Sequence, residues 1–446
     1  MDAVLQSGWL LEQEGRALLT RLDRLRPFVL YETRVPAAGP SPVATSAIHK
    51  YLAGTARKLR ASVLDYLAWL RRAQERGSTP REMQRRFTLV RLRFNAMISH
   101  FDIFADVITQ RSEYENGVWL AGLDSVAADS LSLPGGYYVP PPVVCYLARG
   151  TGAAIRRART RLPGGGDNPV GVIRIPRERM VGSGIASSLI HEVGHQAAAL
   201  LNLVPSLRRA LQDMQRRDGA NQLVWELYER WISEIVADFW SVARVGIAST
   251  IGLVGVVSLP SAFVFRVTLD DPHPVPWIRV LLSARIGSAL YPDPQWARLS
   301  RVWESFYPLE QLKDERRALF ERLLAGMDAF VSLLVNHRPQ SLRGNSLREV
   351  MQTGERLPAR LISLWRNWQR NPDEIRKTTP TIVFAVIGQA RANGEITPER
   401  ESWLLGQLLA HWAVKDALGV RSVYGEVKFP AAPVGLRPVR GKFISG

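Results

Sequence analysis

Apolar residues recur at helical spacing through the first hundred residues of the chain. Three amphipathic helices are predicted there, over residues 1–33, from about 46 to 76, and from residue 79 onward. The third begins with Thr79 as its cap and Pro80 in its first turn. Its apolar face consists of Phe87, Val90, Phe94, Ile98, Phe101 and Phe104. The pattern predicts a helical bundle over residues 1–112.

The pattern changes after residue 112, where short apolar runs alternate with segments rich in Pro and Gly. Two of these runs are predicted strands, residues 143–147 and 170–175, with a basic helix between them from about 151 to 161. A long helix rich in Ala and Leu is expected from about 183 to 202. We expect the 170–175 strand, next to this helix, to expose an edge on which an extended peptide can pair.

The remainder of the chain is predominantly helical in its pattern. Helices are predicted over residues 207–217 and 221–244, and again beyond residue 292, with starts at 371–374 and 397–399. The last sixteen residues, 431–446, are expected to form a loosely held tail. The predicted fold class is mainly α with a small β-sheet (α+β), in three domains covering residues 1–112, 113–295 and 296–446.

Residues 245–265 contain no charged side chain and are long enough to span a bilayer. They contain three glycines and a proline, so we interpret them as buried interior, with a membrane helix as the alternative. The amino terminus lacks a charged-then-apolar leader. We therefore expect a cytoplasmic protein, with membrane association less favoured.

The chain has 446 residues and a formal net charge of +17. Its basic residues are spread along helical segments, which favours solvated helix faces over a specific nucleic-acid or lipid surface. No nucleic-acid-binding module is recognisable, so no specific nucleic-acid partner is expected. Cys145 is the only cysteine, which excludes an intramolecular disulfide and a multi-cysteine metal site.

The pentapeptide His191-Glu192-Val193-Gly194-His195 carries the most specific chemistry in the chain. On a helix, residues four apart share a face, so both imidazoles can bind one Zn²⁺ ion. Glu192 lies between them and can act as a general base on water. The surrounding helix is strongly apolar, and a buried histidine pair there needs a polar partner.

A catalytic zinc site needs a third protein ligand. The all-histidine pattern H-E-x-x-H-x-x-G-x-x-H has Gly and His where this chain has Ala198 and Leu201, so a carboxylate is predicted instead. The best candidate is Glu234, in an apolar helical segment, with Glu226 and Glu229 as alternatives. Asp238 shares a face with Glu234 and is expected to accept a hydrogen bond from the far nitrogen of a zinc-bound histidine.

H-E-x-G-H followed by E-x-x-A-D resembles the gluzincin clan of zinc metallopeptidases, to which thermolysin belongs. The segment from His273-Pro274 to Arg279 is similar to an element of prenyl-protein endopeptidase relatives of that clan. The resemblance covers roughly residues 170–280. It implies a zincin-like catalytic core flanked by helical regions, and it implies that His273 or Arg279 donates to the developing oxyanion.

These features predict a zinc-dependent metallopeptidase in which Glu192 is the general base and the substrate is a protein or peptide. The alternative is a non-enzymatic interaction protein with a structural or degenerate zinc site. The oligomeric state is left open by the sequence.

Overall fold

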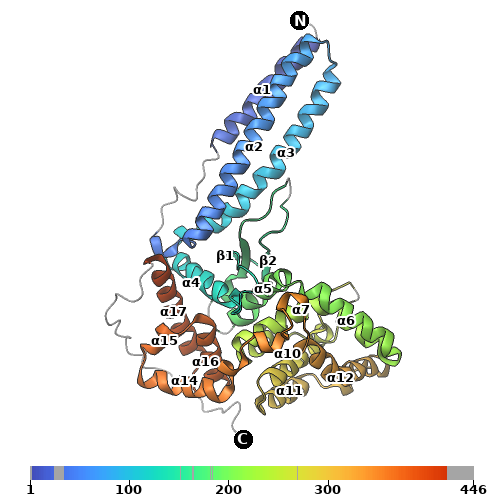
Figure 1. Cartoon of the computed structure of the whole chain (residues 1–446), viewed down its shortest axis with the longest axis vertical. Helices are drawn as coiled ribbons and strands as arrows, with labels where there is room; N and C mark the ends of the chain where they lie inside the picture. Colours follow the sequence, from blue (N-terminus) through green and yellow to red (C-terminus); the bar gives the residue numbers. More distant parts are fainter. Residues whose placement is uncertain are drawn as a thin grey trace. The chain divides into compact units, whose positions relative to one another are not determined.

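The computed structural model describes residues 3–24, 35–150, 152–162, 165–180, 182, 184–268 and 270–418 (Figure 1). These residues are mostly helical and include a small three-stranded sheet, which confirms the predicted fold class. They form two compact units. The first takes in described residues of 1–121, 141–146 and 156–172, and the second those of 122–140, 147–155 and 173–446. The three domain boundaries given above stay a prediction.

Long helices dominate the first unit: α1 (Ala3–Arg24), α2 (Pro42–Glu75) and α3 (Pro80–Thr109), followed by the start of α4 (Tyr114–Leu131). The predicted start of α3 is confirmed, since the Thr79 side chain accepts a hydrogen bond from the Glu82 amide at 3.3 Å. Ser41 caps α2 in the same way. The part of the predicted first helix beyond residue 24 lies outside the described residues.

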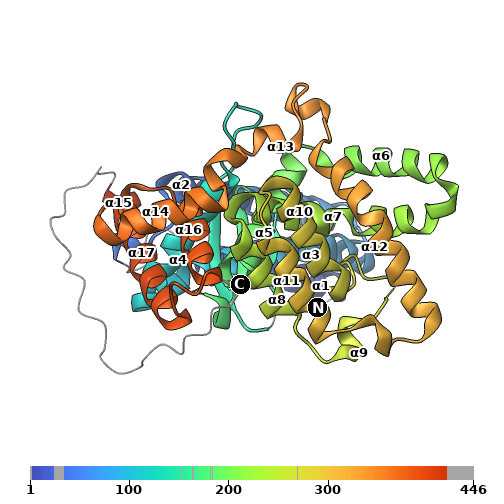
Figure 2. The ribbon, with the colours of Figure 1, turned by 90° about the horizontal axis from the view of Figure 1, so that it is seen from below.

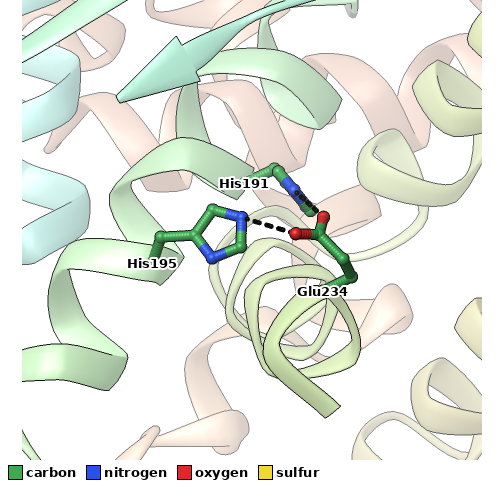
Figure 3. A group of neighbouring side chains, drawn as sticks. All are labelled: His191, His195 and Glu234. Carbon is green, nitrogen blue, oxygen red and sulfur yellow. Dashed lines mark hydrogen bonds and ion pairs between the residues drawn. The ribbon is translucent and has the colours of Figure 1, made fainter. Parts of the chain in front are cut away.

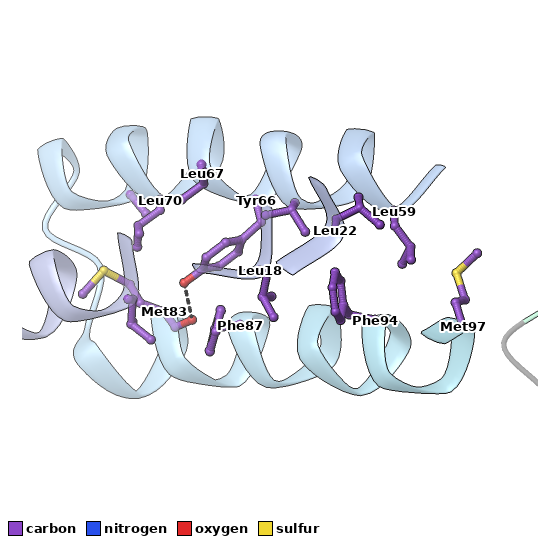
Figure 4. Close-up of a cluster of buried hydrophobic side chains, with 13 residues drawn as sticks. Leu18, Leu22, Leu59, Tyr66, Leu67, Leu70, Met83, Phe87, Phe94 and Met97 are labelled. Atoms are coloured by element: carbon purple, nitrogen blue, oxygen red, sulfur yellow. Dashed lines mark hydrogen bonds between the residues drawn. The ribbon is translucent and has the colours of Figure 1, made fainter. Parts of the chain in front are cut away.

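Buried apolar side chains join the three long helices along their length (Figure 4). Leu18 of α1, Tyr66 of α2 and Phe87 of α3 are each no more than 2% exposed. A second cluster, which includes Ile48 and Phe104, continues this core toward the strands of the unit. Burial of these faces stabilises the bundle, as the amphipathic pattern predicts.

Among the described residues, thirteen further α-helices make up most of the second unit. They are α5 (Gly184–Leu200), α6 (Leu203–Arg217), α7 (Gln222–Val245), α8 (Ile247–Val257), α9 (Ser261–Val264), α10 (Pro276–Leu290), α11 (Gln295–Phe306), α12 (Asp314–Val335), α13 (Leu347–Val350), α14 (Pro358–Arg370), α15 (Glu374–Lys377), α16 (Pro380–Ala392) and α17 (Pro398–Leu418). Helix α7 packs against α5, α6, α8, α10 and α16, so it lies at the centre of this unit (Figure 2). Almost every side chain from Trp231 to Val245 is buried. The predicted tail at 431–446 lies outside the described residues.

The sheet is formed by β1 (Val143–Ala148), β2 (Ala154–Arg156) and β3 (Gly171–Pro176) in the order β1-β3-β2. The predictions of strands at 143–147 and 170–175 are confirmed. The prediction that the 170–175 strand offers a free edge is wrong, because β3 is hydrogen-bonded on both sides. As the central strand, β3 has a neighbouring strand on each edge.

The predicted basic helix over residues 151–161 is also wrong. This segment contains β2 and then turns back on itself, with Arg159 at a φ of 63°. The Asn168 side chain donates to the carbonyl oxygens of Arg156 and Arg157, and the Arg159 amide donates to the Asn168 carbonyl. These longer-range hydrogen bonds replace the local ones that a helix would need.

The uncharged segment 245–265 is divided among several elements. Gly246, at a φ of 57°, separates α7 from α8, and α8 ends at Val257. The first part of α8 is buried, as predicted, whereas residues 258–263 are exposed. Among the described residues, none of the helices has the length and apolar character needed to cross a bilayer.

Candidate metal centre

Two helices of the second unit carry the polar residues of the site. His191, Glu192 and His195 lie on α5, and Glu234 and Asp238 lie on α7. In each helix the paired residues are four apart and therefore share a face. The two helices pack closely because Gly194 on α5 has no side chain where it meets α7. Close packing brings the two polar faces within contact distance.

His191, His195 and Glu234 form a compact cluster (Figure 3). His191 Nε2 lies 3.1 Å from Glu234 Oε2, and His195 Nε2 lies 3.4 Å from Glu234 Oε1. The two imidazole rings are perpendicular, with centroids 4.9 Å apart. Each of the three residues offers one ligand atom, and these atoms all lie within 4.8 Å of one another. The structure thus brings together the three residues predicted as metal ligands.

The far nitrogen of His191 faces a second carboxylate. His191 Nδ1 lies 2.8 Å from Asp238 Oδ1, while Arg279 of α10 donates to Asp238 from Nε at 2.7 Å and from a terminal nitrogen at 2.9 Å. In the neutral ring, an Nδ1–H that donates to Asp238 leaves Nε2 with a lone pair directed at the cluster. Arg279 therefore contacts the Asp238 carboxylate, which in turn contacts His191. The nearest distance from Arg279 to a carboxylate oxygen of Glu234 is 4.0 Å.

His273 reaches the same cluster from the loop before α10. Its Nε2 lies 3.3 Å from Glu234 Oε2, and its Nδ1 lies 2.7 Å from Asp271 Oδ1. The His273 amide also donates to that Asp271 oxygen, at 3.0 Å. Asp271 is not among the predicted site residues, although an aspartate side chain often bonds the backbone two residues further along the chain. The His273 side chain is 49% exposed, so this side of the cluster is open to solvent.

Charge and burial shift the pKa values of this cluster in opposite directions. Burial alone lowers the pKa of His191, but the Asp238 and Glu234 carboxylates outweigh it and raise that pKa to about 9. Burial raises the pKa of Glu234 and Asp238, yet neighbouring cations and hydrogen bonds hold both well below their usual values. Both carboxylates are therefore ionised, which is the form that a metal ligand or the partner of a ligating histidine would need.

Glu192 behaves differently from the other two carboxylates. Its side chain is buried, and burial raises its pKa, although His191 and His195 oppose the rise. A carboxyl group whose pKa is raised toward neutrality is suited to take up and release a proton. Glu192 is thus the acid–base candidate of the site, as the motif predicts.

The donor set matches the chemistry of zinc. Two imidazole nitrogens and one carboxylate oxygen are common ligands of a catalytic Zn²⁺ ion, which keeps a fourth position for water or substrate. The hydrogen bond from His191 to Asp238 provides the support that ligating histidines usually have. The residues present therefore fit a zinc ion.

The alternative ligands Glu226 and Glu229 lie outside the cluster. Glu229 accepts hydrogen bonds from Gln212 and Gln215, and Glu226 is exposed and accepts one from Gln222.

Comparison of the chain with protein-family models, curated proteins and solved structures finds no match.

Proposed function

We propose that this protein is a zinc-dependent metallopeptidase that hydrolyses a protein or peptide substrate. The observation that carries the proposal is the convergence of His191, His195 and Glu234 from two helices, with Glu192 beside them. When bound, zinc supplies a Lewis acid that polarises a carbonyl oxygen and promotes the ionisation of water. His191, His195 and Glu234 hold the ion.

Glu192 is the proton carrier in this proposal. Its carboxylate removes a proton from the attacking water and then passes it to the leaving amine. Burial raises the pKa of Glu192, which makes its carboxylate a stronger base toward water than an exposed glutamate. The burial of the carboxyl therefore supports this role.

His273 and Arg279 have different roles in the proposed reaction. His273 is half exposed and lies at the rim of the cluster, so in its doubly protonated form it can donate from Nε2 to the oxyanion that forms on the substrate carbonyl. Asp271 orients that ring through Nδ1. The two shortest contacts of Arg279 go to Asp238, and a longer one of 3.4 Å reaches His191 Nδ1, so we assign Arg279 to positioning Asp238 and His191.

The proposal is tested by elemental analysis of the full chain together with digestion of a peptide library. We expect one zinc per chain and a hydrolysis that a chelator abolishes and zinc restores. Glu192→Gln should retain zinc and lose activity by about 10²-fold or more. Glu226→Gln makes the same chemical change on an exposed residue of α7 and should retain full activity.

Unchanged hydrolysis in Glu192→Gln would refute the assigned mechanism. Stoichiometric zinc without hydrolysis of any library member would refute the peptidase. It would instead favour a structural site in an interaction protein.

A further inference from the structure

A cavity of about 850 Å³ lies in the first unit, remote in sequence from the residues of the metal centre. Its walls come from α2, α3 and residues 165–167. Cavities of roughly 300–1,000 Å³ are the usual size for binding a small organic molecule. The volume therefore suits a compact ligand.

Four cationic side chains surround the opening: Lys50 and Lys58 on α2, and Arg86 and Arg93 on α3. All four are exposed, and none forms an ion pair within the part of the chain that the structure describes. The Arg86 guanidinium lies 4.3 Å from the centre of the Trp69 ring, which holds it in place.

Two carboxylates, Asp65 and Asp167, also line the cavity. Four cations and two anions leave two formal positive charges around it. A concave site with this charge attracts a dianion more strongly than a neutral molecule.

The floor of the cavity is apolar. Leu59 and Tyr66 of α2 and Met97 of α3 line it, and they are 1%, 2% and 5% exposed (Figure 4). These side chains belong to the core of the helical bundle, so the floor is rigid. Val90, which is half-buried, extends the apolar surface toward the opening.

The wall at residues 165–167 is also fixed. The Tyr51 hydroxyl lies 2.7 Å from His100 Nδ1, which holds the tyrosine ring in one position. Gly166, at a φ of 95°, lies against this ring, and a Cβ atom there would be 3.3 Å from Tyr51 Cε2. The cavity is therefore formed before any ligand binds, which lowers the entropic cost of binding.

We propose that this cavity binds a phosphate-bearing amphiphile, with its phosphate at the cationic opening and its apolar part against the floor formed by Leu59, Tyr66 and Met97. A doubly charged phosphomonoester matches the two excess positive charges. The apolar floor argues against a nucleic-acid backbone as the ligand, because such a backbone binds along an extended charged surface. The phosphate group is common to lipid headgroups and to free phosphorylated metabolites.

Calorimetric titration of the full chain distinguishes these sources. The probes are monomeric dihexanoyl phosphatidic acid, glycerol 3-phosphate and dihexanoyl phosphatidylcholine. We expect one phosphatidic acid per chain, bound at least about tenfold more tightly than either of the other two. Equal affinity for glycerol 3-phosphate would overturn the apolar part of the proposal, and equal affinity for phosphatidylcholine would overturn the charge part.

Charge reversal locates the bound phosphate. Lys58→Glu combined with Arg93→Glu should weaken binding of the phosphatidic acid by about tenfold or more. Arg57→Glu with Arg91→Glu makes the same change in net charge on the same two helices, at exposed residues that do not line the cavity. This control should leave the affinity within about twofold. An equal loss of affinity in the two double variants would overturn the assignment of the phosphate to this cavity.

Gly54 provides a test of occupancy that does not threaten folding. It lies within α2 and lines the cavity, and a Cβ atom there meets nothing within 4 Å. Gly54→Phe should fill the cavity and abolish binding, whereas Gly54→Ala should retain it. Both changes favour the helix, so both proteins should remain folded. Undiminished binding in Gly54→Phe would refute the cavity as the binding site.

Discussion

The backbone of Gly194 in α5 runs directly against the backbone of Ala237 in α7. A Cβ atom on Gly194 would lie 2.8 Å from Ala237 Cα and 2.9 Å from its carbonyl oxygen. Any side chain larger than hydrogen must therefore separate the two helices. This contact lies between the histidines on one helix and the two carboxylates on the other, so it sets their spacing.

Gly194→Ala should lower the free energy of unfolding by about 1–3 kcal/mol, because the methyl group overpacks against backbone that cannot yield. It should also weaken zinc binding, since the ligands on the two helices move apart. Denaturant titration and zinc analysis measure both effects. Gly255→Ala is the matched control in α8, where a Cβ meets nothing, and it should stabilise by up to about 1 kcal/mol. A stable Gly194→Ala protein with full zinc would contradict this account of the helix contact.

Glu234→Gln should remove zinc binding. An amide cannot supply the negative charge that the site needs, so we expect the affinity to fall by about 100-fold or more. Glu229→Gln, on the same helix but hydrogen-bonded to Gln212 and Gln215, should keep its zinc. Competition with a chromophoric chelator gives both affinities. Equal zinc affinity in the two variants would show that Glu234 is not a ligand.

Arg279→Met should be strongly destabilising. It leaves the buried Asp238 carboxylate with His191 as its remaining partner among the described residues, and breaking a buried pair in this way costs about 3–5 kcal/mol. Arg285→Met on the same helix breaks an exposed pair with Asp328 and should cost less than about 1 kcal/mol. Comparable unfolding free energies for the two variants would contradict the positioning role of Arg279.

His273→Asn should reduce kcat by about 10²-fold while zinc content stays unchanged, because the substitution removes a donor to the oxyanion and no ligand. Asp271→Asn should have a smaller effect, since it only loosens the orientation of the ring. Steady-state kinetics and zinc analysis on the same preparations test this. Loss of zinc in His273→Asn would mean that His273 holds the metal, and an unchanged kcat would exclude it from the reaction.

Local patterns in the sequence predicted much of the fold. The start of α3 at Thr79-Pro80 and the strands β1 and β3 are confirmed, because capping and side-chain alternation are properties of a few neighbouring residues. The shared face of His191 and His195 follows in the same way from the helical repeat. The segment 151–161 was mispredicted because its partner, Asn168, lies beyond the window in which a helical pattern is recognised.

Residues far apart in the chain meet only through tertiary packing. Glu234 follows His191 by 43 residues, and Arg279 follows Asp238 by 41, so no local periodicity relates them. The motif marks Glu234 as a candidate, but the close approach of α5 and α7 at Gly194 decides that it reaches the histidines. Tertiary packing likewise directs Arg279 to Asp238 and places β3 between two strands.

The sequence by itself therefore determined where most of the long helices form and which faces carry the polar residues, because these depend on propensity and periodicity over one or two turns. The tertiary structure decided which faces meet, which carboxylate each cation contacts and where a cavity remains. These outcomes depend on side-chain volume and on distances between helices, and a linear pattern contains neither.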